Sequence, residues 1–219
     1  MGKQSRTFAV IGLGTFGRTV ASELARLGNH VVGIDCEERH VKTMADELSA
    51  TAILDATDED ALREAGVDRY DVALVAIGDI EASILTTMNL KLLGLEAIWV
   101  KAMTKTHHRI LSKVGANRVI LPEQEMGRHI AQMLNNPALR DYVNLGNGYS
   151  VFNIVVPERL NGKTMEALGM DEDFEVRLLG VMRGSNFLGP DAPGLMLEHE
   201  DRLILLGKRT ELWRFGDAL

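Results

Sequence analysis

A glycine-rich segment near the start of the chain constrains its fold more than any other feature. Apolar residues 8–11 run into Gly12, Gly14 and Gly17, and apolar residues at helical spacing follow. A strand that turns into a helix through this Gly-x-Gly-x-x-Gly spacing is typical of a Rossmann-like phosphate loop. Gly12 permits the tight turn, Gly14 lets a phosphate approach the backbone, and Gly17 lets the helix pack closely on the strand.

An aspartate at the end of the next apolar run limits which nucleotides could bind. Asp35 follows residues 31–34, roughly twenty positions after the glycines, where a carboxylate accepts hydrogen bonds from a ribose diol and repels a 2′-phosphate. The sequence therefore predicts an adenosine nucleotide without a 2′-phosphate. The competing role for Asp35 is to cap a helix predicted over residues 38–48. Cys36 follows directly, where a small packed side chain or a redox role fits.

Strand and helix patterns alternate six times before the pattern changes. Short β-α-β repeats of this kind predict an α/β fold with a Rossmann-like, doubly wound parallel sheet. Helical spacing of apolar residues is clearest over residues 80–93. The predicted strands are residues 8–11, 31–34, 51–54, 72–77, 97–100 and 119–121.

The change of pattern predicts a second domain. A helix over residues 125–135 ends at Asn135, Asn136 and Pro137, and residues 144–148 have the composition of a loop. We accordingly predict a Rossmann-like domain with a crossover helix at residues 1–140 and a small α+β domain at residues 141–219. The elements predicted in the second domain are strands 151–156, 176–182 and 203–206, a turn at 183–186 and a brief helix at 164–168.

Composition argues against several classes of function. The chain of 219 residues has a net charge of −7 and no run of Lys or Arg, which argues against a nucleic-acid partner. No uncharged apolar stretch approaches the roughly 18 to 20 residues that span a bilayer, and no secretory signal is expected. The single cysteine excludes an internal disulfide and fits a reducing cytoplasm.

No residue pattern supports catalysis. A hydride-transfer enzyme needs an acid or base beside the nicotinamide, but the C-terminal part holds one histidine, His199, in a polar turn. His107 and His108 are adjacent on a predicted helix and point about 100° apart, so they cannot ligate one metal as a pair. We therefore predict no catalytic residues and no enzyme activity.

Taken together, the motifs resemble those of KtrA and TrkA type regulatory subunits, which are RCK-domain proteins. The resemblance covers essentially the whole chain. It rests on residues 8–17, Asp55-Ala-Thr57, Val75-Ala-Ile-Gly78, residues 98–102 and Pro122-Glu-x-x-Met-Gly127. It implies an N-terminal and a C-terminal RCK domain.

The resemblance also implies a regulator without chemistry of its own. Such a subunit would bind ATP or ADP, with NAD as a further candidate, and its dimers would build an octameric ring on the cytoplasmic face of the cell membrane. Its partner would be a potassium-translocating membrane subunit of the KtrB or TrkH type, controlled by ligand-dependent changes of the ring. Cyclic di-AMP is a candidate ligand of the C-terminal domain.

The positions assigned to the nucleotide combine the glycine segment with the ends of later strands. The Asp55-Ala56 turn faces the crevice of the sheet, with organisation of the next helix as the alternative role for Asp55. Lys101 fits a contact with a phosphate or an acidic partner, with a solvated lysine as the alternative. The predicted nucleotide-binding residues are Gly12, Gly14, Thr15, Phe16, Gly17, Asp35, Asp55, Ala56, Ile77, Gly78 and Lys101.

Two positions bear on the phosphates. In the resembling family, the glutamate that matches Glu123 lies at a dimer interface near a divalent or monovalent cation, so Glu123 is the predicted metal ligand. The alternative is a glutamate that the helix dipole favours at a helix start. Thr15 stands where many members of the family carry arginine, which leaves the choice among ATP, ADP and NAD open.

Three functions from different classes remain. A nucleotide-sensing regulatory subunit of a potassium transporter fits these residues best. An NAD-dependent oxidoreductase would need a catalytic acid–base pair, and an NADH-sensing repressor would need a basic winged-helix region; the sequence shows neither. The helix over residues 125–135 is expected to transmit nucleotide binding to the partner, because it has an apolar face at Met126, Ile130, Met133 and Leu134. The alternative is that this face packs on its own domain.

Overall fold

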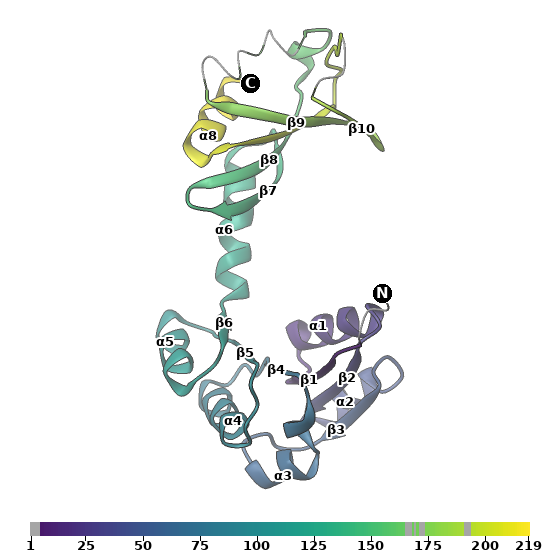
Figure 1. Cartoon of the computed structure of the whole chain (residues 1–219), viewed down its shortest axis with the longest axis vertical. Helices are drawn as coiled ribbons and strands as arrows, with labels where there is room; N and C mark the ends of the chain where they lie inside the picture. Colours follow the sequence, from purple (N-terminus) through teal and green to yellow (C-terminus); the bar gives the residue numbers. More distant parts are fainter. Residues whose placement is uncertain (1–4, 165–167, 169, 171–173, 191–193) are drawn as a thin grey trace. The chain divides into compact units, whose positions relative to one another are not determined.

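The computed structural model describes residues 5–164, 168, 170, 174–190 and 194–219 (Figure 1). The chain divides into two compact units, Met1–Gln124 and Glu125–Leu219. This division falls inside the helix α6 (Pro122–Asn135), whereas the predicted domains at residues 1–140 and 141–219 divide after it. Among the described residues, no helix combines the length and the apolar character that crossing a bilayer requires.

The N-terminal unit is the expected doubly wound sheet. Six parallel strands lie in the order β3-β2-β1-β4-β5-β6, so the connections run outward in both directions from the neighbours β1 and β4. The strands are β1 (Thr7–Ile11), β2 (His30–Asp35), β3 (Ala50–Ile53), β4 (Val72–Val75), β5 (Ile98–Lys101) and β6 (Arg118–Ile120). The helices are α1 (Thr15–Arg26), α2 (Glu38–Met44), α3 (Glu59–Glu64), the 3-10 turn η1 (Val67–Arg69), α4 (Ile80–Leu92) and α5 (Lys105–Val114).

Alternate side chains of the central strands form separate cores on the two faces of this sheet. Val10 of β1 packs with Ala21 of α1 and Val41 of α2. Its neighbour Ile11 belongs to the cluster that contains Leu90 of α4 and Leu111 of α5. Since successive strand residues point to opposite faces, α1 and α2 cover one face and α4 and α5 cover the other.

Three elements, two in this unit and α6 at its end, differ from the predicted bounds by more than one residue at an end. β4 ends at Val75 rather than at residue 77, and α2 ends at Met44 rather than at residue 48. α6 begins at Pro122 rather than at residue 125. Proline fits the first helical position because that position needs no amide donor, so the proline opens the helix.

The C-terminal unit is a five-stranded antiparallel sheet in the order β10-β9-β11-β8-β7. Phe152 and Leu205 of neighbouring strands are buried with Phe215 of the last helix, so this helix packs on one face of the sheet. The elements are β7 (Leu139–Gly146), β8 (Tyr149–Val155), the 3-10 turn η2 (Glu158–Leu160), β9 (Val176–Arg183), β10 (Asn186–Leu188), β11 (Arg202–Lys208) and α8 (Arg209–Ala218).

The prediction of a loop at residues 144–148 is wrong for residues 144–146. Residues 144–146 belong to β7, and the turn is formed by Asn147 and Gly148, which have φ of 51° and 82°. Positive φ at both residues is the conformation that Asn-Gly favours in a two-residue hairpin. The turn at residues 183–186 is confirmed as the β9–β10 connection. The brief helix predicted at residues 164–168 includes residues 165–167, which lie outside the described residues.

Candidate nucleotide-binding site

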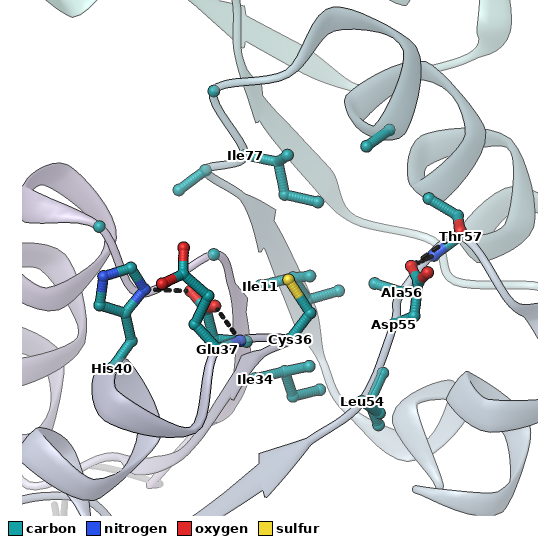
Figure 2. A pocket seen from close by; sticks show the side chains of 16 residues that line it. Ile11, Ile34, Cys36, Glu37, His40, Leu54, Asp55, Ala56, Thr57 and Ile77 are labelled. Atoms are coloured by element: carbon teal, nitrogen blue, oxygen red, sulfur yellow. Dashed lines mark hydrogen bonds and ion pairs between the residues drawn. The ribbon is translucent and has the colours of Figure 1, made fainter.

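A cleft of about 240 Å³ lies at the carboxyl ends of the strands β1 to β4 (Figure 2). In an open parallel sheet, ligands bind at this edge, where the connections diverge. The residues that line the cleft are Ile11, Gly12, Gly14, Ile34, Asp35, Cys36, Glu37, His40, Leu54, Asp55, Ala56, Thr57, Ala76, Ile77, Gly78 and Ala82.

The three glycines of the loop are required for different reasons. Gly12 has φ of 95°, and a Cβ there would lie 2.9 Å from the carbonyl carbon of Ala76. A Cβ on Gly17 would lie 1.8 Å from the carbonyl oxygen of Gly12. A Cβ on Gly14 would meet nothing within 4 Å. Gly12 and Gly17 therefore serve the packing of the loop, while the open space at Gly14 is available to a ligand.

The start of α1 offers the donors that a phosphate needs. Its N-cap is Gly14, which has no side chain to accept from the helix amides, and the first turn contains no acidic residue. The amides of Thr15, Phe16 and Gly17 in this turn have no carbonyl partner within the helix. Free amides and the positive end of the helix dipole suit an anionic group, so these residues fit a nucleotide phosphate.

The carboxylate of Asp35 organises the adjoining wall of the cleft. Its Oδ2 accepts a hydrogen bond from the amide of Leu13 at 2.6 Å, and its Oδ1 accepts one from the amide of Glu37 at 2.8 Å. The side chain is 9% exposed. Glu37 rather than Asp35 is the N-cap of α2, so the capping role predicted as the alternative is replaced by a bond that joins β2 to the glycine loop.

The turn after β3 is fixed from both sides. The Oδ1 of Asp55 accepts from the amide and the hydroxyl of Thr57 at 2.9 and 2.7 Å, and these two hydrogen bonds lower the pKa of Asp55. On the other side, buried Asn89 of α4 donates to the carbonyl oxygen of Thr57 at 2.8 Å. Asp55 thus organises the turn, and Asp55 and Ala56 also line the cleft.

Lys101 and Glu123 form a pair beside the cleft, not within its lining. The Lys101 Nζ lies 2.5 Å from the Glu123 Oε1, and this hydrogen bond lowers the pKa of Glu123. The same Nζ lies 5.7 Å from the ring centre of Phe16, in the first turn of α1. With 12% of its side chain exposed, Lys101 is not the solvated lysine considered as an alternative.

The metal role of Glu123 stays a prediction. Within the described ranges, no three His, Cys, Asp or Glu side chains gather as a metal-binding group. A cation at Glu123 would have to replace Lys101 as its partner and draw further oxygen ligands from the nucleotide.

The structure brings most of the predicted residues to one edge of the sheet. Seven line the cleft directly, namely Gly12, Gly14, Asp35, Asp55, Ala56, Ile77 and Gly78. Glu37 and His40 line it as well and were missed. The signal for Glu37 in the sequence was its place two residues after Asp35, at the end of a central strand. His40 lies further on, in α2 (Figure 2).

The C-terminal unit contains a second, polar cavity of about 410 Å³, lined in part by Arg183 and Asp201. Asp201 is 2% exposed and accepts from the Arg183 Nε at 3.0 Å and the Arg183 Nη2 at 2.8 Å. Burial raises the pKa of Asp201, but the hydrogen bonds from Arg183 and from the Glu198 amide outweigh burial and lower it. This pair holds the turn before β11 on the sheet.

Comparison with known proteins places the whole chain beside potassium uptake proteins. Residues 8–122 match the model of the TrkA-N domain, and residues 150–219 match that of the TrkA-C domain. The chain is 35% identical to the Ktr system potassium uptake protein A of Bacillus subtilis (strain 168), over 97% of this chain and 96% of that protein. It is 36% identical to the Ktr system potassium uptake protein A of Vibrio alginolyticus, over 94% of each. A crystal structure of GsuK bound to ADP aligns with a TM-score of 0.53 at 25% identity, over 59% of this chain and 34% of that one.

Proposed function

Because this chain belongs to the family that joins a TrkA-N domain to a TrkA-C domain, as in the Ktr potassium uptake proteins, we propose that it is a nucleotide-sensing regulatory subunit of a membrane potassium transporter. The observation that carries the proposal is the complete glycine loop beside Asp35, in a chain related end to end to such proteins. The subunit would act in the cytoplasm, at the inner face of the membrane.

The cleft favours ADP or ATP over a dinucleotide. The residues that line it come from the ends of β1 to β4 and from the segments that follow these strands. In a Rossmann-like site, the adenosine half of the ligand binds in this region. The ends of β5 and β6, where a dinucleotide would continue, carry the Lys101–Glu123 pair instead. The Lys101 Nζ lies near the first turn of α1, where the phosphates would bind. If Lys101 paired with a phosphate instead of Glu123, the Glu123 carboxylate would be available to bind a cation. GsuK structures bound to ADP and to NAD both align with this chain, so NAD stays the second candidate.

Control of a transporter requires that the nucleotide bind two states of an assembly with different affinity. α6 is suited to report this difference because it spans the boundary between the units. Its side chains Met126, Ile130 and Leu134 are 56%, 47% and 78% exposed. An apolar helix face of this kind needs cover, which we assign to a second subunit in a dimer that builds a ring, octameric in the resembling family. Cyclic di-AMP at the C-terminal domain remains a proposal.

The single cysteine gives a direct test of occupancy. Cys36 lines the cleft, so a nucleotide bound there should slow its alkylation by a maleimide. We expect protection by ADP and ATP, weaker protection by NADH and none by NADPH, with calorimetric titration as the independent measure.

Flux of potassium through the reconstituted transport subunit should then respond to addition of the protein and to the nucleotide supplied. Flux that ignores both would refute the regulatory role, and turnover of NADH with a substrate would favour an oxidoreductase.

A further inference from the structure

The carboxylate of Asp35 is nearly saturated by hydrogen bonds from the protein itself. It accepts from the amides of Glu37 and Leu13, and the Nδ1 of His40 lies 3.2 Å from the same Oδ2 that Leu13 contacts. A carboxylate offers about four acceptor sites. One site therefore remains for a ribose diol, which donates two hydrogen bonds when a carboxylate recognises it fully.

The contact with His40 is the one that can be exchanged. The other two donors are backbone amides of the glycine loop and of the N-cap of α2, which cannot turn away. The His40 contact is the longest of the three, and the side chain is 25% exposed. Figure 2 shows the imidazole at the edge of the cleft beside Glu37. Because a carboxylate only accepts, the Nδ1 of His40 carries the proton in this contact.

We propose that His40 competes with the ribose for Asp35 and thereby makes nucleotide affinity depend on pH, an inference that rests on the proposed nucleotide site. Neutral His40 can turn away and free the second acceptor. Protonated His40 makes a charge-assisted hydrogen bond, about twice as strong as a neutral one, and keeps its place. Since histidine changes charge between about pH 5 and 8, affinity should fall as the pH falls through that range.

Two other titratable groups that line the cleft, Cys36 and Asp55, keep their charge state over this range. Burial and the neighbouring carboxylates raise the pKa of Cys36, so its thiol stays neutral. The pKa of Asp55 is lowered by Thr57, so that carboxylate stays ionised. Glu37 is paired with Arg39 at 2.6 Å. A His40 cation would also attract the phosphates of a nucleotide, which would strengthen binding at low pH, so the sign of the dependence separates the two roles.

Titration calorimetry with ADP tests the proposal. We expect wild-type affinity to be about tenfold lower at about pH 5.5 than at about pH 8. His40→Gln keeps a side-chain donor but does not titrate, so its profile should retain only the effect of protonating the phosphate. His30→Gln removes an exposed histidine at the opposite end of β2 and should keep the wild-type profile. With 2′,3′-dideoxy-ADP, which lacks the diol, wild type and His40→Gln should show the same profile.

Two results would overturn the proposal while leaving the nucleotide site in place. One is a pH profile for ADP that His40→Gln does not change. The other is tighter binding at low pH that His40→Gln abolishes. Absence of ADP binding by the wild type at every pH would refute the proposed nucleotide site itself, and the role of His40 with it.

Discussion

Replacing Gly14 by alanine should weaken nucleotide binding strongly and leave the fold intact. Gly14 has φ of −64° and ψ of −176°, which any residue can adopt, and the added Cβ meets nothing within 4 Å. Alanine is a poorer N-cap than glycine, but it also restricts the unfolded chain. These effects have opposite signs and similar size, so the free energy of unfolding should change by less than about 1 kcal/mol.

The new methyl group would stand where a phosphate approaches the first amides of α1. A hydrogen bond to a charged group contributes about 1.5–3 kcal/mol. Loss of two such bonds would weaken binding by about 3–6 kcal/mol, which is about a hundredfold or more in Kd.

Gly17→Ala is the matched control because the same methyl group there meets the protein. Its Cβ would lie 1.8 Å from the carbonyl oxygen of Gly12, and the backbone of the loop would have to move. We expect a loss of about 3 kcal/mol or more in the free energy of unfolding. Urea unfolding and calorimetric titration with ADP measure the two effects separately. Wild-type affinity for ADP in a folded Gly14→Ala protein would refute this account of the loop.

Three further changes test other parts of the molecule. Asp35→Asn should weaken ADP binding by about 1.5–3 kcal/mol and narrow the preference for NADH over NADPH, since it removes the negative charge at the ribose; an unchanged preference in calorimetry would contradict the ribose role. Glu123→Gln should abolish any dependence of ADP affinity on Mg²⁺, and a dependence that persists would place the cation elsewhere. Asp201→Asn should lower the free energy of unfolding by about 1.5–3 kcal/mol, measured with urea. Because the pKa of Asp201 is below its usual 3.8, this contribution is complete at neutral pH and is lost as the pH falls through the lowered value, so wild type and variant should converge in acid.

The N-terminal unit could be predicted closely because its signals are local. A few neighbouring residues are enough to indicate a glycine at positive φ, a close approach of helix to strand, or an acid at a strand end. The Gly-x-Gly-x-x-Gly spacing predicted that a side chain would not fit at Gly12 or Gly17, and in the structure a Cβ at either position would clash with backbone atoms. The places of Gly14 and Asp35 in the cleft follow from the same pattern.

The parts that escaped prediction depend on contacts distant in the sequence or on exposed strands. Lys101 and Glu123 pair across the ends of neighbouring strands, and neither position alone signals the other. β7 lies at the edge of its sheet, where exposed Val143 and Leu145 break the alternation that marks a half-buried strand. His40 was overlooked because a histidine on a helix face has no distinctive spacing.

The turn held between Asp55 and Asn89 bears on the thermodynamics and speed of binding. Hydrogen bonds from Thr57 to Asp55 and from Asn89 to the Thr57 carbonyl oxygen restrain it from within and from α4. A wall that is already ordered loses little conformational entropy when a ligand settles against it. We therefore expect the entropic penalty of binding to arise mainly from the nucleotide, and association to proceed without a slow rearrangement of this side of the cleft.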